Sequence, residues 1–183
     1  MVRRLAAPGD IGTQGVKLRF LIGTGLAMTV LAVAGLSPSP FLVWNASSSV
    51  PIGLYFIEAT RPELNDLALV QLPVVTARLA NERAYLQSTN DVLKPVAAVA
   101  GDWVCRFGTS ILVNGRFAAL AQSADGAGRP MPSWRGCLRL AQDQVFLLSD
   151  PIDSFDSRYF GPIAGSQVIG RAHQLWAPTS SSR

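Results

Sequence analysis

The stretch VLKPVAAVAGDWVCRFGTSILVNG, residues 92–115, decides the fold class. Its apolar and β-branched residues fall into three short runs. Gly101 and Asp102 separate the first run from the second, and Gly108 separates the second from the third. Short apolar runs bounded by turn residues are typical of β-strands. The part from 106 to 115 predicts a hairpin with Gly108 in its turn.

The rest of the body follows the same pattern, with one exception. The exception is VVTARLANERAYLQ, residues 74–87, whose good helix formers place Val75, Leu79 and Leu86 on roughly one face. Residues 121–136 are polar and predict a long loop. Further strands are predicted at LYFIEA, DLALVQL, CLRLA, QVFLLS and QVIGRAHQLW. The sequence therefore predicts a compact, mainly β domain with one short helix.

An uncharged segment, FLIGTGLAMTVLAVAGL at 20–36, follows a basic N-terminus. A spanning helix needs about 20 apolar residues, and roughly 17 suffice when flanking Lys and Arg reach the interface. A cleavable signal peptide is the competing interpretation, but SPSPF lacks a clean small-x-small cleavage site. The cations before the segment predict a cytoplasmic N-terminus and an external body. The predicted segments are a basic cytoplasmic tail at 1–17, a transmembrane anchor at 18–37, an extracytoplasmic domain at 38–179 and a disordered tail at 180–183.

The distribution of charge argues against a nucleic-acid partner. The chain of 183 residues has a net charge of +4, of which residues 1–19 carry +3. Nucleic-acid binding needs many clustered cations. The body, at +1, has no such excess. FLVW at 41–44 is instead apolar enough for the membrane interface, where Trp44 is favoured.

The chain has two cysteines, Cys105 and Cys137. Two cysteines in an exported domain pair more often than not, and two separate buried thiols are the alternative. The sequence has no CxxC motif, and its single histidine, His173, lies near the C-terminus, where a structural role is the commoner one. We therefore expect a disulfide, no metal site and no cofactor.

The distribution of lysines suggests a catalytic base. Beyond the N-terminal tail the chain has 11 arginines and one lysine, Lys94. A buried lysine can lose its proton near neutral pH, whereas arginine cannot. The serine cluster in NASSSVPIGLY, residues 45–55, offers a hydroxyl nucleophile for such a base. The alternatives are a strand lysine that reaches water and a Ser-rich linker.

A third polar segment is DSFDSRYFGPI, residues 153–163. If this segment is extended, Asp156 and Arg158 share one face and can pair, with Ser154 on the same face. Such a pair either fixes a strand beside the lysine or is an ordinary ion pair.

Taken in this order, NASSSVPIGLY, LKPVAAVAGD and SFDSRYFGPI resemble the TraF-type conjugative transfer signal peptidases. These belong to the serine–lysine signal peptidase I superfamily, and the resemblance covers residues 45 to about 176. It implies a signal-peptidase-like β-barrel or sandwich behind one N-terminal transmembrane helix.

The resemblance also implies roles for individual residues. Ser49 falls on the nucleophile of a Ser-x-Pro motif, and Lys94 on the base that precedes Gly-Asp. Ser47 falls on the hydroxyl donor of the oxyanion hole. Ser154 falls on the serine that hydrogen-bonds the lysine, and Asp156 and Arg158 fall on the family's Asp/Arg pair.

Two departures from the general signal peptidases stand out. Those enzymes have Ser-Met-x-Pro, and the shorter spacing here leaves Ser48 as an alternative nucleophile. They also have Gly-Asp-Asn-Arg where this chain has LLSD, residues 147–150. Both differences favour the conjugation-specific branch.

The function implied is a membrane-anchored serine endopeptidase of a conjugative transfer system. Its expected partners are a membrane-anchored pilin precursor and inner-membrane lipid, with no nucleic acid and no metal. The expected location is the inner membrane, with a periplasmic catalytic domain. Hydrolysis and cyclisation of the pilin both stay open. The alternatives are a general leader peptidase and a non-catalytic scaffold of a transfer channel.

Overall fold

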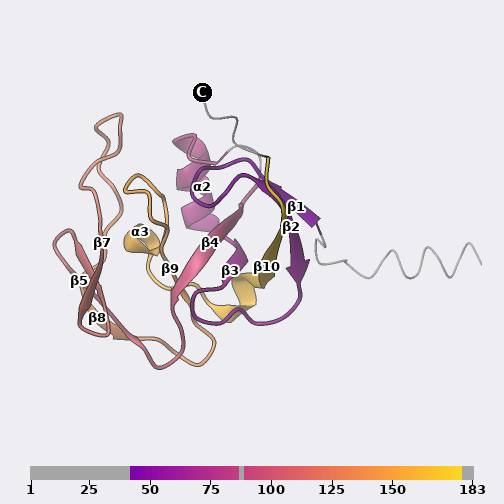
Figure 1. Cartoon of the computed structure of the whole chain (residues 1–183). Helices are drawn as coiled ribbons and strands as arrows, with labels where there is room; N and C mark the ends of the chain where they lie inside the picture. Colours follow the sequence, from indigo (N-terminus) through magenta and orange to yellow (C-terminus); the bar gives the residue numbers. More distant parts are fainter. Residues whose placement is uncertain (1–41, 87–88, 179–183) are drawn as a thin grey trace, which may run out of the picture. The chain divides into compact units, whose positions relative to one another are not determined.

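The computed structural model describes residues 42–86 and 89–178. Most of the described strands form one sheet of six, in the order β1-β2-β10-β3-β4-β9, with every neighbouring pair antiparallel (Figure 1). Their bounds are β1 Leu42–Asn45, β2 Gly53–Glu58, β10 Val168–Trp176, β3 Leu67–Gln71, β4 Asp91–Ala98 and β9 Phe146–Leu147.

A second sheet has four strands in the order β7-β6-β5-β8. The bounds are β5 Trp103–Phe107, β6 Ser110–Val113, β7 Arg116–Leu120 and β8 Gly136–Arg139. The predicted hairpin is confirmed: β5 and β6 pair through Phe107 and Ser110, and Gly108 has a φ of 61° in the turn. A positive φ of this kind is accessible to glycine at no steric cost.

Two α-helices and one 3₁₀ turn complete the described chain. Helix α2 spans Val74–Glu82, so the predicted helix exists but ends before its expected limit at 87. Helix α3, Ser157–Phe160, was not predicted, and the expectation of a single helix is therefore wrong. The 3₁₀ turn η1, Gly165–Gln167, leads into β10. Strands β1 and β7 were also missed, because FLVW was assigned to the membrane interface and RFAAL shows no alternation of apolar and polar residues.

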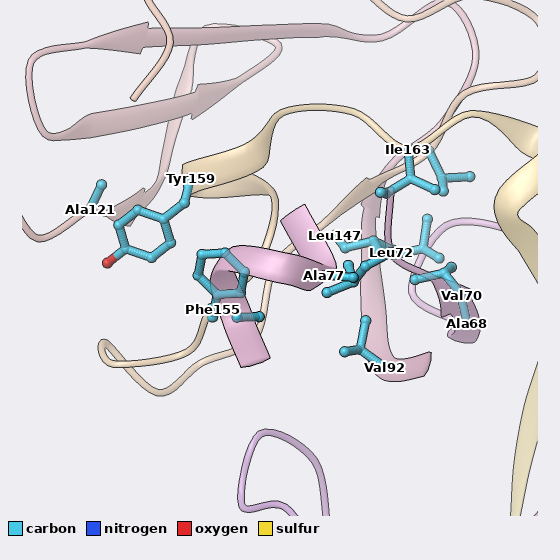
Figure 2. Close-up of a cluster of buried hydrophobic side chains, with 13 residues drawn as sticks. Ala68, Val70, Leu72, Ala77, Val92, Ala121, Leu147, Phe155, Tyr159 and Ile163 are labelled. Carbon is cyan, nitrogen blue, oxygen red and sulfur yellow. The ribbon is translucent and has the colours of Figure 1, made fainter. Parts of the chain in front are cut away.

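Three clusters of buried apolar residues hold the elements together. The largest contains α2, β3, β4 and the aromatic residues around α3, and Figure 2 shows Phe155 and Tyr159 with Leu72, Ala77 and Leu147 of this cluster. A second cluster lies around β2 and includes Val50 of the β1–β2 loop. The third joins the two sheets. Its members are Ala98 of β4 and Phe146 of β9 in the first sheet, Val104 of β5 and Ile111 of β6 in the second, and Leu140, which follows β8.

The predicted basic tail at 1–17, the anchor at 18–37 and the tail at 180–183 lie outside the described residues. Within the part that the structure describes, no helix is long and apolar enough to cross a membrane.

Candidate active site

The lysine at the centre of the site lies on the buried face of its strand. Lys94 lies in β4 and pairs with Ala68 of β3. Alternate residues of a strand share a face. Lys94 is therefore on the face of Val92 and Val96, which belong with Ala68 to the large core cluster. Only 4% of Lys94 is exposed.

The serine that faces Lys94 comes from the loop between β1 and β2. In this hairpin Asn45 is opposite Gly53, so residues 46–52 form the connection. The Nζ atom of Lys94 donates a hydrogen bond of 2.7 Å to Oγ of half-buried Ser49. The neighbouring Ser48 is exposed, and among the described contacts of Lys94 no hydrogen bond reaches it.

A second serine contacts the same amine from the other end of the chain. Lys94 Nζ donates a 2.7 Å hydrogen bond to Oγ of Ser154, which is 4% exposed. The position of Ser154 is fixed by its neighbour Phe155, whose ring packs against Tyr85 and Tyr159 at centroid distances of 5.1 and 5.9 Å. The amine is thus held between two hydroxyls.

Asp156 and Arg158 form the predicted ion pair, but not on a strand. Asp156 is the N-cap of α3, and its Oδ1 accepts hydrogen bonds from the backbone N–H of Arg158 at 3.1 Å and from Arg158 Nε at 2.8 Å. A side chain that caps a helix two residues before its partner can meet that partner across the first turn, so sharing a strand face is not required. Both side chains are buried, with 0% and 2% exposed.

The ion pair is anchored on all sides. Asp156 Oδ2 accepts from the backbone N–H of Ser149 at 3.0 Å. The guanidinium of Arg158 also donates to backbone carbonyls, those of Leu120, Ile152 and Ser149. A buried pair with this many partners fixes the segment that carries Ser154.

Burial lowers the pKa of Lys94 from 10.5 to about 8. The negative charges of Asp156 and Asp153 oppose this effect, and the positive charge of Arg158 adds to it. Because the cost of removing the ammonium from water dominates, the neutral fraction of Lys94 at pH 7 is far larger than that of an ordinary lysine.

Ser47 is in the same loop, but among the described residues the hydrogen bonds of Lys94 go to Ser49 and Ser154 and not to Ser47. Its hydroxyl donates to Oδ1 of Asn45 at 2.9 Å, and its backbone N–H donates to the same atom at 3.1 Å. Two further residues hold this loop and were not predicted, Asn45 and Tyr55. The Oη atom of Tyr55 donates a 2.6 Å hydrogen bond to the Pro51 carbonyl. Both lie inside the quoted NASSSVPIGLY motif, which was the available signal.

Ser49, Lys94 and Ser154 line a cleft of about 670 Å³. Its other walls include Tyr85, Phe155 and Met131, which suit an apolar part of a substrate. No group of His, Cys, Asp or Glu side chains within residues 42–86 and 89–178 is arranged to hold a metal ion. Cys105 and Cys137 form a disulfide between β5 and β8, and neither lines the cleft.

Comparison with known proteins identifies the family to which this chain belongs. Residues 15–177 match the signal peptidase family, peptidase S26. The chain belongs to the signal peptidase family. Its membership supports a serine peptidase, and the described part of this signal peptidase family member is mainly β with two helices.

Similar proteins add detail to the assignment. The chain is 37% identical over 166 residues to the probable conjugal transfer protein TraF of Sinorhizobium fredii, covering 82% of this chain and 87% of that protein. It is 33% identical over 160 residues to the plasmid transfer protein TraF of Escherichia coli, covering 81% and 88%. The resemblance to TraF-type signal peptidases is therefore confirmed. A signal peptidase I structure from Enterococcus faecalis matches with a TM-score of 0.37 and 17% identity over 62% of this chain and 98% of that one.

Proposed function

We propose that this signal peptidase family member is a membrane-anchored endopeptidase of a conjugative transfer system, which processes a pilin precursor with a Ser49–Lys94 dyad. The observation that carries the proposal is the 2.7 Å contact between Lys94 Nζ and Ser49 Oγ, at an amine that is 4% exposed. Similarity to TraF proteins along most of the chain supports the role in conjugative transfer.

Lys94 is the general base of the proposed reaction. With a pKa of about 8, roughly one tenth of its amines are neutral at pH 7, and the neutral fraction passes one half near pH 8. The neutral amine takes the proton of the Ser49 hydroxyl. Ser154 keeps the amine in place, because its Oγ accepts another hydrogen bond from the same nitrogen.

The chemical step is acyl transfer. Ser49 Oγ attacks the scissile carbonyl carbon as its proton passes to Lys94, and a tetrahedral oxyanion forms. The backbone N–H of Ser49 and the hydroxyl of Ser47 donate to that oxyanion. When the intermediate collapses, Lys94 gives its proton to the leaving amine, and the acyl-enzyme remains on Ser49. One oxyanion donor is worth about 2.7–4 kcal/mol of barrier.

A second nucleophile releases the acyl group. Lys94 removes a proton from water or from an incoming amine as that nucleophile attacks the carbonyl carbon of the Ser49 ester. The bond between that carbon and Ser49 Oγ then breaks, and Lys94 returns the proton to Ser49 Oγ, which regenerates the hydroxyl. Water gives a linear product. The amino terminus of the same pilin gives a cyclic product, and both outcomes fit the same dyad.

The proposed location follows from the N-terminal sequence. The uncharged segment within 18–37 anchors the chain in the inner membrane, the basic tail at 1–17 stays in the cytoplasm, and the catalytic domain faces the periplasm. Exposed Trp44 follows shortly after the anchor and suits a position near the lipid interface, where a membrane-anchored pilin precursor would be presented.

The test is conversion of a co-expressed pilin precursor, read by mass. Wild-type chain should convert it, and Ser49→Ala and Lys94→Arg should each abolish conversion, the latter because a guanidinium keeps its proton. Ser48→Ala is the matched control: the same change one residue away, at an exposed serine, should leave conversion intact. Conversion by Ser49→Ala would refute the proposal.

Two further outcomes point to the alternative functions. Rescue of general secretion in a cell depleted of its leader peptidase would favour a housekeeping enzyme. An unmodified Ser49 after treatment with a serine-directed penem, together with unconverted pilin, would favour a non-catalytic scaffold of the transfer channel.

A further inference from the structure

One buried side chain holds the serine loop through hydrogen bonds to its backbone. Asn45, at the end of β1, is 7% exposed. Its Nδ2 donates hydrogen bonds of 2.9, 3.1 and 3.0 Å to the carbonyls of Ser47, Val50 and Pro51. These carbonyls flank Ser49 on both sides. The orientation of the amide is fixed, because only its nitrogen can donate to carbonyls, with one of its two N–H groups shared between two of the three.

The oxygen of the same amide faces Ser47. Asn45 Oδ1 accepts both the backbone N–H and the hydroxyl of Ser47, at 3.1 and 2.9 Å. If the hydroxyl turns toward an oxyanion, Oδ1 still keeps the N–H. This rotation of the Ser47 hydroxyl therefore exchanges one hydrogen bond for another and leaves no buried acceptor unpaired.

We propose that Asn45 is a positioning residue for the nucleophile loop: its amide nitrogen sets the position of Ser49 against Lys94, and its amide oxygen holds the Ser47 hydroxyl ready for the oxyanion. This inference rests on the proposed function. Asn45 touches no reacting atom in this role. It acts through the loop backbone and through Ser47, and Tyr55 adds a second hydrogen bond to the Pro51 carbonyl from β2.

The test uses the full-length chain and two substitutions. Asn45→Asp keeps the acceptor for Ser47 but loses the three donated bonds, and Asn45→Ala loses all of them without adding charge. The rate of cleavage is followed on a peptide that spans the processing site of the pilin precursor. Active sites are counted by penem acylation of Ser49, read by mass, so that misfolded molecules do not enter kcat.

Both variants should lose about 100-fold in kcat per counted site, because a displacement of about 1 Å at a reacting group has an effect of that size. KM should change by less than about threefold. In Asn45→Ala, which adds no charge, the pH at which activity is half maximal should stay near 8, since Asn45 is not among the groups that shift the pKa of Lys94. A purely structural residue would instead lower the number of counted sites and leave kcat per site unchanged.

Asn114→Asp is the matched control, because Asn114 Nδ2 donates to Asp102 Oδ1 at 2.9 Å in the turn between β6 and β7, outside the cleft. It should retain kcat per site. Wild-type kcat per site in Asn45→Asp or Asn45→Ala would overturn the role of Asn45 while leaving the dyad standing. A wild-type chain that neither cleaves nor is acylated would remove the dyad and this inference together.

Discussion

Lys94 lies in an apolar environment that raises the free energy of its charged form. Its strand neighbours on the same face are Val92 and Val96, and Ala68 lies across from it. Asp156 and Asp153 offset part of the cost, yet the pKa still falls to about 8. The hydroxyls of Ser49 and Ser154 accept hydrogen bonds from its nitrogen. These partners are uncharged, so they do not hold the amine in its charged form as a carboxylate would. The burial that lowers the pKa of Lys94 therefore also reduces the stability of the fold while the amine is charged.

Replacing Lys94 should make the fold more stable at low pH. The pKa of Lys94 is lower in the folded chain, about 8, than its ordinary value of 10.5. The unfolded chain thus binds more protons in this window, and wild-type stability rises with pH between about 8 and 10.5. Lys94→Met removes this dependence.

The free energy of unfolding of Lys94→Met minus that of wild type should be larger at pH 6 than at pH 10.5 by ~3 kcal/mol, so the variant gains most stability at low pH. Urea denaturation at the two pH values measures the difference. An equal difference at both pH values would mean that the amine is not desolvated in the fold.

The two residues of the proposed dyad could be singled out in the sequence because their side chains are rare or clustered. Lys94 is the only lysine after the N-terminal tail, and Ser49 lies two residues before Pro51 in a serine-rich motif. Asn45 could not be identified in the same way. An asparagine before serines is ordinary in a turn, and its five hydrogen bonds depend on the path of the loop.

At the scale of elements, α3 is short but organises one side of the site. Its N-cap, Asp156, pairs with Arg158 of the first turn, and the preceding Ser154 reaches Lys94. Alternation of Asp, Ser and Arg also fits a strand, which is why the segment was predicted as extended. Four helical residues give no periodicity from which the helix could be recognised.

Breaking this pair should strongly destabilise the domain. Asp156→Asn leaves Arg158 buried without a counter-charge, which typically costs about 3–5 kcal/mol. Denaturant unfolding of the full chain measures it. Asp153→Asn is the matched control, since this neighbouring carboxylate is exposed and should change stability by less than about 0.5 kcal/mol. Similar stability of the two variants would show that the pair does not fix α3.

The predictability of the strands follows their burial. Strand β2 alternates buried and exposed residues, and β3 and β4 are apolar runs, so all three were predicted. Strand β7 has four exposed residues of five, and its sequence carries no alternation. Strand β1 is an edge strand whose exposed Leu42 and Trp44 were assigned to a membrane interface.

At the scale of the whole domain, the second sheet supports the site from a distance. Arg106 of β5, which is 4% exposed, donates to the backbone carbonyl of Arg158 and so connects this sheet to α3. The neighbouring Cys105 joins β5 to β8 through its disulfide with Cys137, which lies 32 positions later in the sequence. Sequence alone could not connect the sheet to the site, because Arg106 and Arg158 are far apart in the chain.

Loss of the disulfide should weaken the fold and leave the chemistry unchanged. A double Cys105→Ala and Cys137→Ala variant should lose about 2–4 kcal/mol of unfolding free energy, since the closed loop no longer restricts the unfolded chain. Thermal unfolding of oxidised wild type and variant gives the difference. Activity per counted site should keep its half-maximum near pH 8, and a displaced half-maximum would mean that the disulfide sets the environment of Lys94.

We expect Lys94 to lose its charge at a pH where an ordinary lysine keeps it. The chain has only two lysines, Lys17 and Lys94, so lysine labelled with ¹³C at Cε gives two NMR signals, and Lys94→Arg assigns one of them. The Lys94 signal should titrate with a midpoint near 8. A midpoint above 10 would contradict the account, because an amine that stays charged cannot take the proton of Ser49.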